Sequence, residues 1–322
     1  MSAVTDQFAA PSAPVRKTPM GTFDLIFRNA SLLAALFVLV LLAGIMLSMV
    51  VGGWPAFREF GLGFITSSVW DTQNEQYGAW PAIVGTLSTA LIALVVGVPL
   101  SLGIAVFLTQ LAPPWFKQPV STAIELLAAV PSIIYGMWGL FVFAPLFAAY
   151  VQIPLSNIVE GMPIVGTILY SRSPSGLGIL TAGIILAFMI IPFIASITRD
   201  MLDQIPSVLR ESAYGIGATT WEVVRHVLVP QAGVSIIGAI MLGLGRALGE
   251  TMAVTFVVGN ANRLSASVMD PGSTIASRIA NEFNEALGLQ LNALIALGCI
   301  LFFVTFVVLV IARLLVARVK RY

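Results

Sequence analysis

Two charged residues of opposite sign, Arg246 and Glu250, lie within the otherwise apolar stretch 231–259. By insertion scales a charge costs roughly 2.5 to 3.5 kcal/mol at the centre of a membrane helix, so such residues face protein, water or a ligand. At a separation of four residues the two side chains would share one helix face and partly neutralise each other. The guanidinium would keep further N–H donors, and a fixed cation suits a small anion. The pair is therefore the first candidate for an anion pathway through a membrane.

The same stretch also permits a structural interpretation. Arg246 and Glu250 would then form an ion pair that bridges helices and is retained for specificity of packing. Gly245 and Gly249 form a G-x-x-x-G pattern on the same predicted helix, which lets another helix approach closely. Both interpretations stay open at the level of sequence.

The composition places the chain in a membrane. Of its 322 residues 58% are hydrophobic and only 10% are charged, and the mean hydropathy is +0.97, whereas soluble domains carry roughly 25% charged residues. The net charge of +1 provides no basic field of the kind that binds nucleic acid, so no nucleic-acid partner is expected. We predict an integral membrane protein in contact with lipid.

Enzyme classes are disfavoured by the residue types that are scarce. The only cysteine is Cys299, which excludes an intramolecular disulfide and a multi-cysteine metal site. The only histidine, His226, falls in the predicted cytoplasmic loop, whereas Cys299 falls in an apolar span, so we find no Ser/His/Asp or Cys/His catalytic set. No G-x-x-x-x-G-K-[ST] sequence occurs, so the chain does not cradle nucleotide phosphates in the P-loop manner. We predict no catalytic residues, no metal site and no cofactor.

Apolar segments of about 20 residues, the length of a membrane-crossing helix, recur along the chain. We predict an all-α integral membrane protein with about six transmembrane helices, near residues 31–51, 82–111, 122–150, 177–197, 234–259 and 291–316. The transmembrane domain 31–316 would follow an N-terminal tail, 1–30, and precede a short C-terminal tail, 317–322. The first apolar run is too long for a signal-peptide core, so it is expected to be retained.

The lysines and arginines predict the orientation. Eleven of them fall in the tails and in the loops on the same side as the tails, and four fall in the loops on the other side. Because positive residues concentrate in cytoplasmic loops, both termini are expected in the cytoplasm.

The cytoplasmic connection 198–231 has the pattern of two short helices joined at a glycine corner. Pro206 can open the first helix and Gly217 breaks the chain direction, while Thr219 and Glu222 have the spacing of a capping box for the second helix. The second helix is expected to end before Pro230. Such an element is suited to fit a groove on a cytoplasmic partner. The alternative at the level of sequence is an ordinary solvated helical loop.

Two sequence patterns resemble a known family. Glu211, Ser212, Ala213, Gly217 and Pro230 have the spacing of the EAA loop in permeases of bacterial ABC importers, although Ser212 replaces the usual alanine. The segment 245–254, which reads GRALGETMAV, is similar to that of phosphate permeases of the PstC and PstA kind. Over most of its length the chain resembles the PstC type.

The resemblance implies a type I ABC importer permease fold in a bacterial cytoplasmic (inner) membrane, with Glu211, Ser212, Ala213, Gly217 and Pro230 coupling to the ATPase. It implies a second permease subunit of the PstA type, cytoplasmic ATP-binding subunits of the PstB type and an extracytoplasmic phosphate-binding protein as partners. The chain would then form half of a pathway for inorganic phosphate, with Arg246 and Glu250 in it.

Other functions remain compatible with the residues. An ABC permease for another oxyanion, such as molybdate or sulfate, would need the same loop and a cation in the membrane. A gradient-driven anion transporter would also want an intramembrane arginine and glutamate, but it would not need the EAA pattern. A sensory membrane subunit is the third alternative.

Overall fold

The computed structural model describes residues 22–172 and 174–319, and parts of both predicted tails therefore lie outside the described residues. The chain divides into two compact units, residues 1–48 and 49–322. The described part of the first unit belongs to α1 (Thr22–Phe60), which continues into the second unit and has 39 residues. This length exceeds the roughly 20 residues that a membrane crossing needs.

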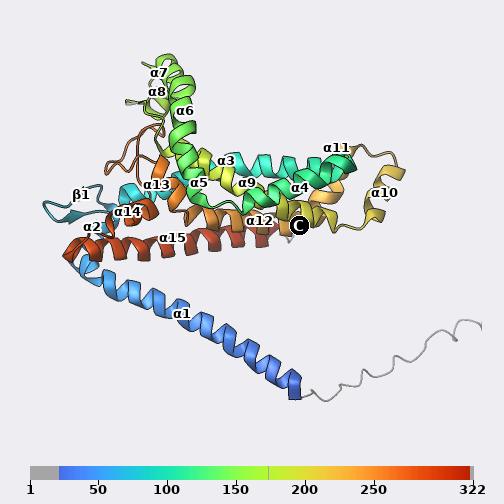
Figure 1. The fold of residues 1–322 in the computed structure, drawn as a ribbon, viewed down its shortest axis with the longest axis horizontal. Coiled ribbons are helices and arrows are strands. Elements are labelled where there is room, and N and C mark those ends of the chain that lie inside the picture. Colours follow the sequence, from blue (N-terminus) through green and yellow to red (C-terminus); the bar gives the residue numbers. More distant parts are fainter. Residues whose placement is uncertain (1–21, 173, 320–322) are drawn as a thin grey trace, which may run out of the picture. The chain divides into compact units, whose positions relative to one another are not determined.

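The second unit is built almost entirely of helices (Figure 1). After α1 its elements are α2 (Gly63–Thr66), β1 (Trp70–Asp71), β2 (Gln76–Tyr77), α3 (Trp80–Val106), α4 (Pro114–Ala128), α5 (Ser132–Trp138), α6 (Ala144–Phe147), α7 (Ile153–Val159), α8 (Val165–Leu169), α9 (Ile179–Asp203), α10 (Ser207–Gly215), α11 (Thr220–Val223), α12 (Val229–Leu248), α13 (Met252–Val257), α14 (Ile275–Glu282) and α15 (Gly288–Val319). Four π-helical turns, η1 (Phe107–Leu111), η2 (Gly139–Phe143), η3 (Ala148–Gln152) and η4 (Val224–Leu228), continue or connect them.

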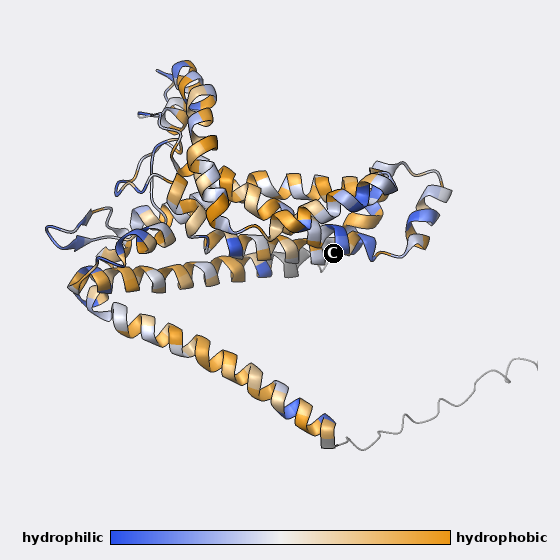
Figure 2. Cartoon of the chain, in the orientation of Figure 1, coloured by the Kyte–Doolittle hydropathy of each residue, from blue (hydrophilic) through white to orange (hydrophobic). Residues whose placement is uncertain are grey.

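Six helices in the described residues are long and apolar enough to cross a membrane, which confirms the predicted fold class. They are Phe23–Phe60, Trp80–Leu111, Ser132–Val159, Ile179–Asp203, Thr220–Leu248 and Gly288–Leu314. Figure 2 shows hydrophobic residues along the shafts of the long helices and hydrophilic residues gathered at the β1–β2 hairpin and around α10.

The helix α9 is the centre of the second unit. In its most apolar window 67% of the residues are buried, against 22 to 28% in four of the other spans. It packs against α3, α12 and α4, and its residues Ile185, Leu186 and Ile190 are fully enclosed in the largest apolar cluster. A helix that is apolar on nearly every side is stable only when neighbours surround it, and α9 has that pattern.

Two of the predicted spans are broken in the structure. The span expected at 122–150 separates into α4 and α5, because Pro131 follows the last residues of α4 and disfavours a helical conformation just before it. The span expected at 234–259 ends with α12 at Leu248, and a new helix, α13, begins at Met252. The segment 151–176, which falls between two predicted spans, contains α7, with which the third span ends, and the short helix α8.

The two ends of the second unit carry different elements. One end holds α10 and α11, and the opposite end holds α14 and the β1–β2 hairpin, from whose vicinity α6, α7 and α8 project (Figure 1). In the hairpin Trp70 pairs with Tyr77, and both rings are buried against α14 and α15 in a second apolar cluster. The long helices thus lie between two different sets of short elements (Figure 1).

Candidate functional site

The structure does not place Arg246 and Glu250 on one helix face. Arg246 lies in the last turn of α12, which ends at Leu248, whereas Glu250 lies in the break before α13. Glu250 Oε1 accepts a hydrogen bond from the backbone N–H of Ala253 at 3.2 Å. The ion pairs within residues 22–172 and 174–319 do not include Arg246 with Glu250. The expected mutual neutralisation is therefore wrong, because the helix ends between the two residues.

Arg246 is an exposed cation on the mostly apolar helix α12. Its guanidinium carbon lies 6.0 Å from the centre of the Phe193 ring on α9, at the outer limit of a cation–π contact. Its side chain is exposed, while its neighbours Ala247 and Leu248 are buried in the main cluster. The backbone carbonyls at the end of a helix favour a positive charge there. The guanidinium is thus available to a ligand or to another subunit.

The predicted glycine corner is present between α10 and α11. Glu211, Ser212 and Ala213 lie on α10, and Gly217 has a φ of +91°, a left-handed conformation that glycine adopts without strain. The predicted capping box is also present: the backbone N–H of Thr219 donates to Glu222 Oε2 at 2.7 Å.

The helix after the corner does not end before Pro230, as the sequence pattern predicted. Residues Thr220–Leu248 form one helical run, in which the π-helical turn η4 precedes the proline. Proline cannot donate to the carbonyl four residues earlier, and its ring clashes with that carbonyl in a regular α-helix. The wider π-turn, in which Val229 N–H donates to Val224 O, changes the bonding pattern just before the ring. The corner is therefore joined rigidly to the helix that carries Arg246.

A groove of about 390 Å³ opens at the corner. Ala213, Gly217 and Val227 contribute to its walls, and the exposed His226 lies at it, as a surface residue. Ile216 is 88% exposed and Trp221 is 67% exposed beside it. Exposed apolar side chains that gather in one place are typical of an interaction surface.

Five charged residues that sequence reasoning did not join as a group meet at the same end of the molecule. Arg199 Nη2 donates to Glu125 Oε1 at 2.8 Å and to Asp200 Oδ1 at 2.6 Å, and Lys117 Nζ lies 3.0 Å from Asp203 Oδ1. The carboxylate of Glu125 on α4 is therefore paired with a guanidinium on α9. The pairing joins α4 to α9 across 74 and 86 residues of sequence, so no local pattern indicates it.

The part of the chain that forms these features matches a known family. Residues 97–321 match the family described as "Binding-protein-dependent transport system inner membrane component". Within the described residues, no group of three or more histidine, cysteine, aspartate or glutamate side chains has the arrangement of a metal site.

Curated relatives are similar over nearly the whole chain. The chain is 54% identical to "Phosphate transport system permease protein PstC" of Pasteurella multocida (strain Pm70), over 92% of this chain and 93% of that protein. It is 53% identical to the protein of the same name from Haemophilus influenzae (strain ATCC 51907 / DSM 11121 / KW20 / Rd), over 92% and 94% of the two chains. The resemblance to PstC-type permeases that the sequence indicates is confirmed.

Solved structures share the fold. The chain aligns with a TM-score of 0.61 and 19% identity to a chain in the crystal structure of a bacterial alginate ABC transporter in complex with an alginate pentasaccharide-bound periplasmic protein, covering 92% of this chain and 98% of that one. A second structure, of a bacterial ABC transporter involved in alginate import, gives a TM-score of 0.57 at 16% identity, covering 92% and 96%. The expected ABC importer permease fold is confirmed.

Proposed function

Because the chain belongs to the family of binding-protein-dependent transport system inner membrane components, we propose that it is the permease subunit of an ATP-driven importer of inorganic phosphate. The observation that carries the proposal is an identity of more than 50% to proteins named for phosphate transport, over 92% of the chain. The chain has no P-loop of its own, so the ATPase site belongs to another subunit.

The proposed complex contains a second permease of the PstA type, ATP-binding subunits of the PstB type and an extracytoplasmic phosphate-binding protein. Both termini of this chain lie in the cytoplasm, as the excess of basic residues on that side supports. The β1–β2 hairpin, α14 and the α6–α8 projection then face the binding protein, and α10 with α11 faces the ATPase.

Coupling follows from the shape of the corner. Glu211, Ser212 and Ala213 on α10, with Gly217 at the turn, present the groove and its exposed apolar side chains to the ATPase. When the ATPase subunits close on ATP, the corner moves with them. Because Pro230 does not interrupt the helical run, this motion passes into α12. The pathway then opens alternately outward and inward.

Arg246 provides the positive charge for the anion in this scheme, and Glu250 lies beside the pathway at the break after α12. An exposed guanidinium in an apolar surface is costly in lipid, and that cost is relieved where the surface lines a watery pathway between two subunits. This chain does not need to bind phosphate tightly, because a strongly favourable binding free energy in the pathway would slow the release of the anion.

Uptake by the reconstituted complex tests the proposal. The two permeases and the ATPase are reconstituted in vesicles with the ATPase on the inner side of the membrane. These vesicles should accumulate labelled phosphate only when ATP is in the lumen and the binding protein is in the external medium. Sulfate and molybdate should compete poorly. Uptake that persists without the ATPase would identify a gradient-driven transporter, and preferential uptake of sulfate or molybdate would assign another oxyanion.

A further inference from the structure

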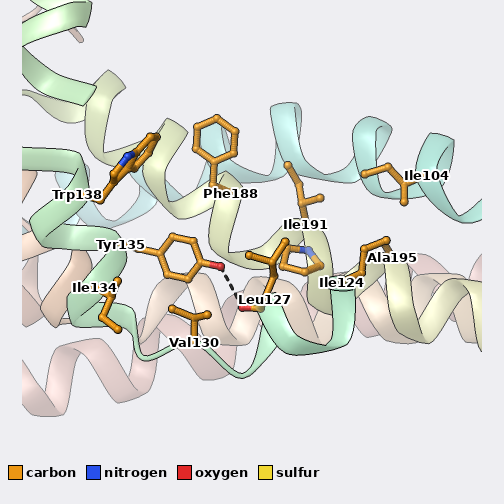
Figure 3. Close-up of a pocket in the computed structure, with 11 residues that line it drawn as sticks. Ile104, Ile124, Leu127, Val130, Ile134, Tyr135, Trp138, Phe188, Ile191 and Ala195 are labelled. Carbon is orange, nitrogen blue, oxygen red and sulfur yellow. Dashed lines mark hydrogen bonds between the residues drawn. The ribbon is translucent and has the colours of Figure 1, made fainter. Parts of the chain in front are cut away.

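Two cavities lie end to end along the crevice between α4 and α9. The inner cavity has a volume of about 530 Å³ and is lined mainly by apolar side chains (Figure 3). The cavity nearer to α10 has a volume of about 490 Å³ and is lined by charged and polar side chains. On α9 the lining residues Phe188, Pro192, Ala195, Arg199 and Asp203 recur every three or four positions. They therefore form one continuous helix face that changes from apolar to charged.

The inner cavity offers no polar group to a ligand. Figure 3 shows the rings of Tyr135, Trp138 and Phe188 at one end of it. The Tyr135 hydroxyl already donates to the backbone carbonyl of Leu127 at 2.9 Å. Trp138 and Phe188 are each 43% exposed, so the cavity is open at this rim. An apolar chain is the chemistry that fits such a space.

The charged cavity has both signs on its walls. The carboxylates of Glu125, Asp200 and Asp203 outnumber the cations of Lys117 and Arg199. A free anion is therefore disfavoured here, because it would meet three negative groups against two positive ones. A ligand that carries an ammonium and a phosphate together matches both signs.

Two donors at this cavity lack partners within the described residues. Arg199 Nη1 and Ser121 Oγ are buried and make no hydrogen bond. Both residues line the cavity, and Arg199 as a whole is only 9% exposed. Native structures rarely leave buried donors unpaired, and a phosphate oxygen is an acceptor for both kinds.

We propose that the α4–α9 crevice binds a phospholipid with a primary-amine headgroup, such as phosphatidylethanolamine. An acyl chain occupies the inner cavity, and the phosphate lies toward Lys117, Ser121 and Arg199. The ammonium lies against the carboxylates of Glu125 and Asp200. The lipid binds beside the corner formed by α10 and α11, and the site does not depend on which anion is transported.

Photocrosslinking identifies what occupies the crevice. A benzophenone amino acid replaces Phe188 at the open rim, and the matched control replaces Leu91, which is 62% exposed on α3 outside the crevice. The full complex is reconstituted in vesicles of equal parts phosphatidylethanolamine, phosphatidylcholine and phosphatidylglycerol, illuminated, and the permease chain is weighed. We expect lipid adducts at position 188 that are several-fold enriched in phosphatidylethanolamine relative to position 91.

Each other outcome overturns the proposal. A crosslink to a polypeptide would mean that another subunit covers the crevice. Equal lipid ratios at the two positions would mean ordinary bilayer contact, and enrichment of phosphatidylglycerol would contradict the headgroup assignment.

Two further variants ensure that the test does not depend on the correct folding of any single variant. Asp200→Asn keeps the shape of an exposed side chain but removes its charge, and should reduce the preference for the amine lipid over phosphatidylcholine. Ile134→Trp at the rim should reduce the total lipid adduct at position 188, while Leu91→Trp should not. An unchanged preference in Asp200→Asn together with unchanged yield in Ile134→Trp would refute the site, whether or not the complex transports phosphate.

Discussion

Arg246 is the residue on which the proposed pathway depends most directly. Its charge is exposed, and the helix end after Leu248 separates it from Glu250. An isolated cation of this kind differs from a buried ion pair, whose disruption leaves an uncompensated charge. The two interpretations therefore predict different behaviour in mutants.

We expect Arg246→Gln to reduce phosphate uptake severely, by roughly tenfold or more, since about 1.4 kcal/mol of lost anion stabilisation corresponds to that factor. The amount of intact complex should stay normal. Arg246→Lys should retain part of the uptake, because the charge stays but the planar donors are lost. Uptake and complex yield are measured side by side in the same membranes.

The matched control is Arg263→Gln, which removes an exposed arginine from the loop between α13 and α14 and should leave uptake unchanged. Glu250→Gln added to Arg246→Gln should not restore transport, because Arg246 and Glu250 do not form an ion pair in the described residues. Full transport in the double mutant would remove Arg246 from the substrate path.

Arg278 illustrates a buried charge with a structural task. It is 3% exposed, its guanidinium lies 4.5 Å from the centre of the Trp70 ring, and its Nη2 donates to Ser273 Oγ at 2.9 Å. Burial lowers its pKa to about 10, and Glu282 opposes this shift. Trp70 Nε1 in turn donates to Glu282 Oε2 at 2.9 Å. The arginine therefore fastens the β1–β2 hairpin to α14.

Replacing Arg278 with alanine should loosen that hairpin. The loss of the stacking contact and of the partner for Ser273 should cost about 1 to 3 kcal/mol locally, as for other buried hydrogen-bonding groups left unsatisfied. Hydrogen exchange of the backbone amides in 70–77 should become faster. The exposed Arg263→Ala serves as the control, and unchanged protection in Arg278→Ala would show that the aromatic contacts alone hold the hairpin.

At the scale of elements, the corner between α10 and α11 is the part that the proposed coupling requires. A Cβ at Gly217 would meet nothing within 4 Å, so a larger side chain would project into the space where a partner docks. The positive φ adds local strain for any other residue.

Gly217→Trp should leave the chain in the membrane and abolish the stimulation of ATP hydrolysis by the loaded binding protein. Gly217→Ala has the same backbone strain without the bulk, and should keep most of that stimulation. ATPase rates of the purified complexes, with and without the binding protein, give the ratio. Normal stimulation in the tryptophan variant would mean that the corner is not the coupling element.

At the scale of the whole molecule, the proposed orientation assigns the two ends of the helical unit to opposite sides of the membrane. Ser207 opens α10 at one end, and Thr72 lies in the hairpin connection at the other; both are exposed. Cys299 is the only cysteine, so its removal gives a clean background.

In a Cys299→Ala chain, Thr72→Cys should react with a membrane-impermeant thiol reagent in cells whose inner membrane is intact and whose outer envelope admits the reagent. Ser207→Cys should react only after the inner membrane is opened. Labelling of both in opened cells is the control for accessibility. Labelling of Ser207→Cys in cells with an intact inner membrane would show that the proposed orientation is wrong.

The features that the sequence by itself determined depend on composition or on neighbours a few residues apart. The apolar segments identify a membrane protein with six spans, because length and hydropathy suffice for that decision. The turn at Gly217 and the capping box of Thr219 with Glu222 were also predicted, since their hydrogen bonds join residues three positions apart.

Tertiary structure decided the features that depend on distant partners or on the exact end of a helix. The sequence pattern indicated that Gly249 allows close packing of helices. In the structure Gly249 follows the last residue of α12, so the helix ends between Arg246 and Glu250. Glycine just after a helix is also a common stop signal. The pairing of Glu125 with Arg199, and the position of α9 at the centre, arise from packing between helices far apart in the chain. Hydropathy records that a helix is apolar, but the choice of its neighbours is made only when all the faces compete for burial.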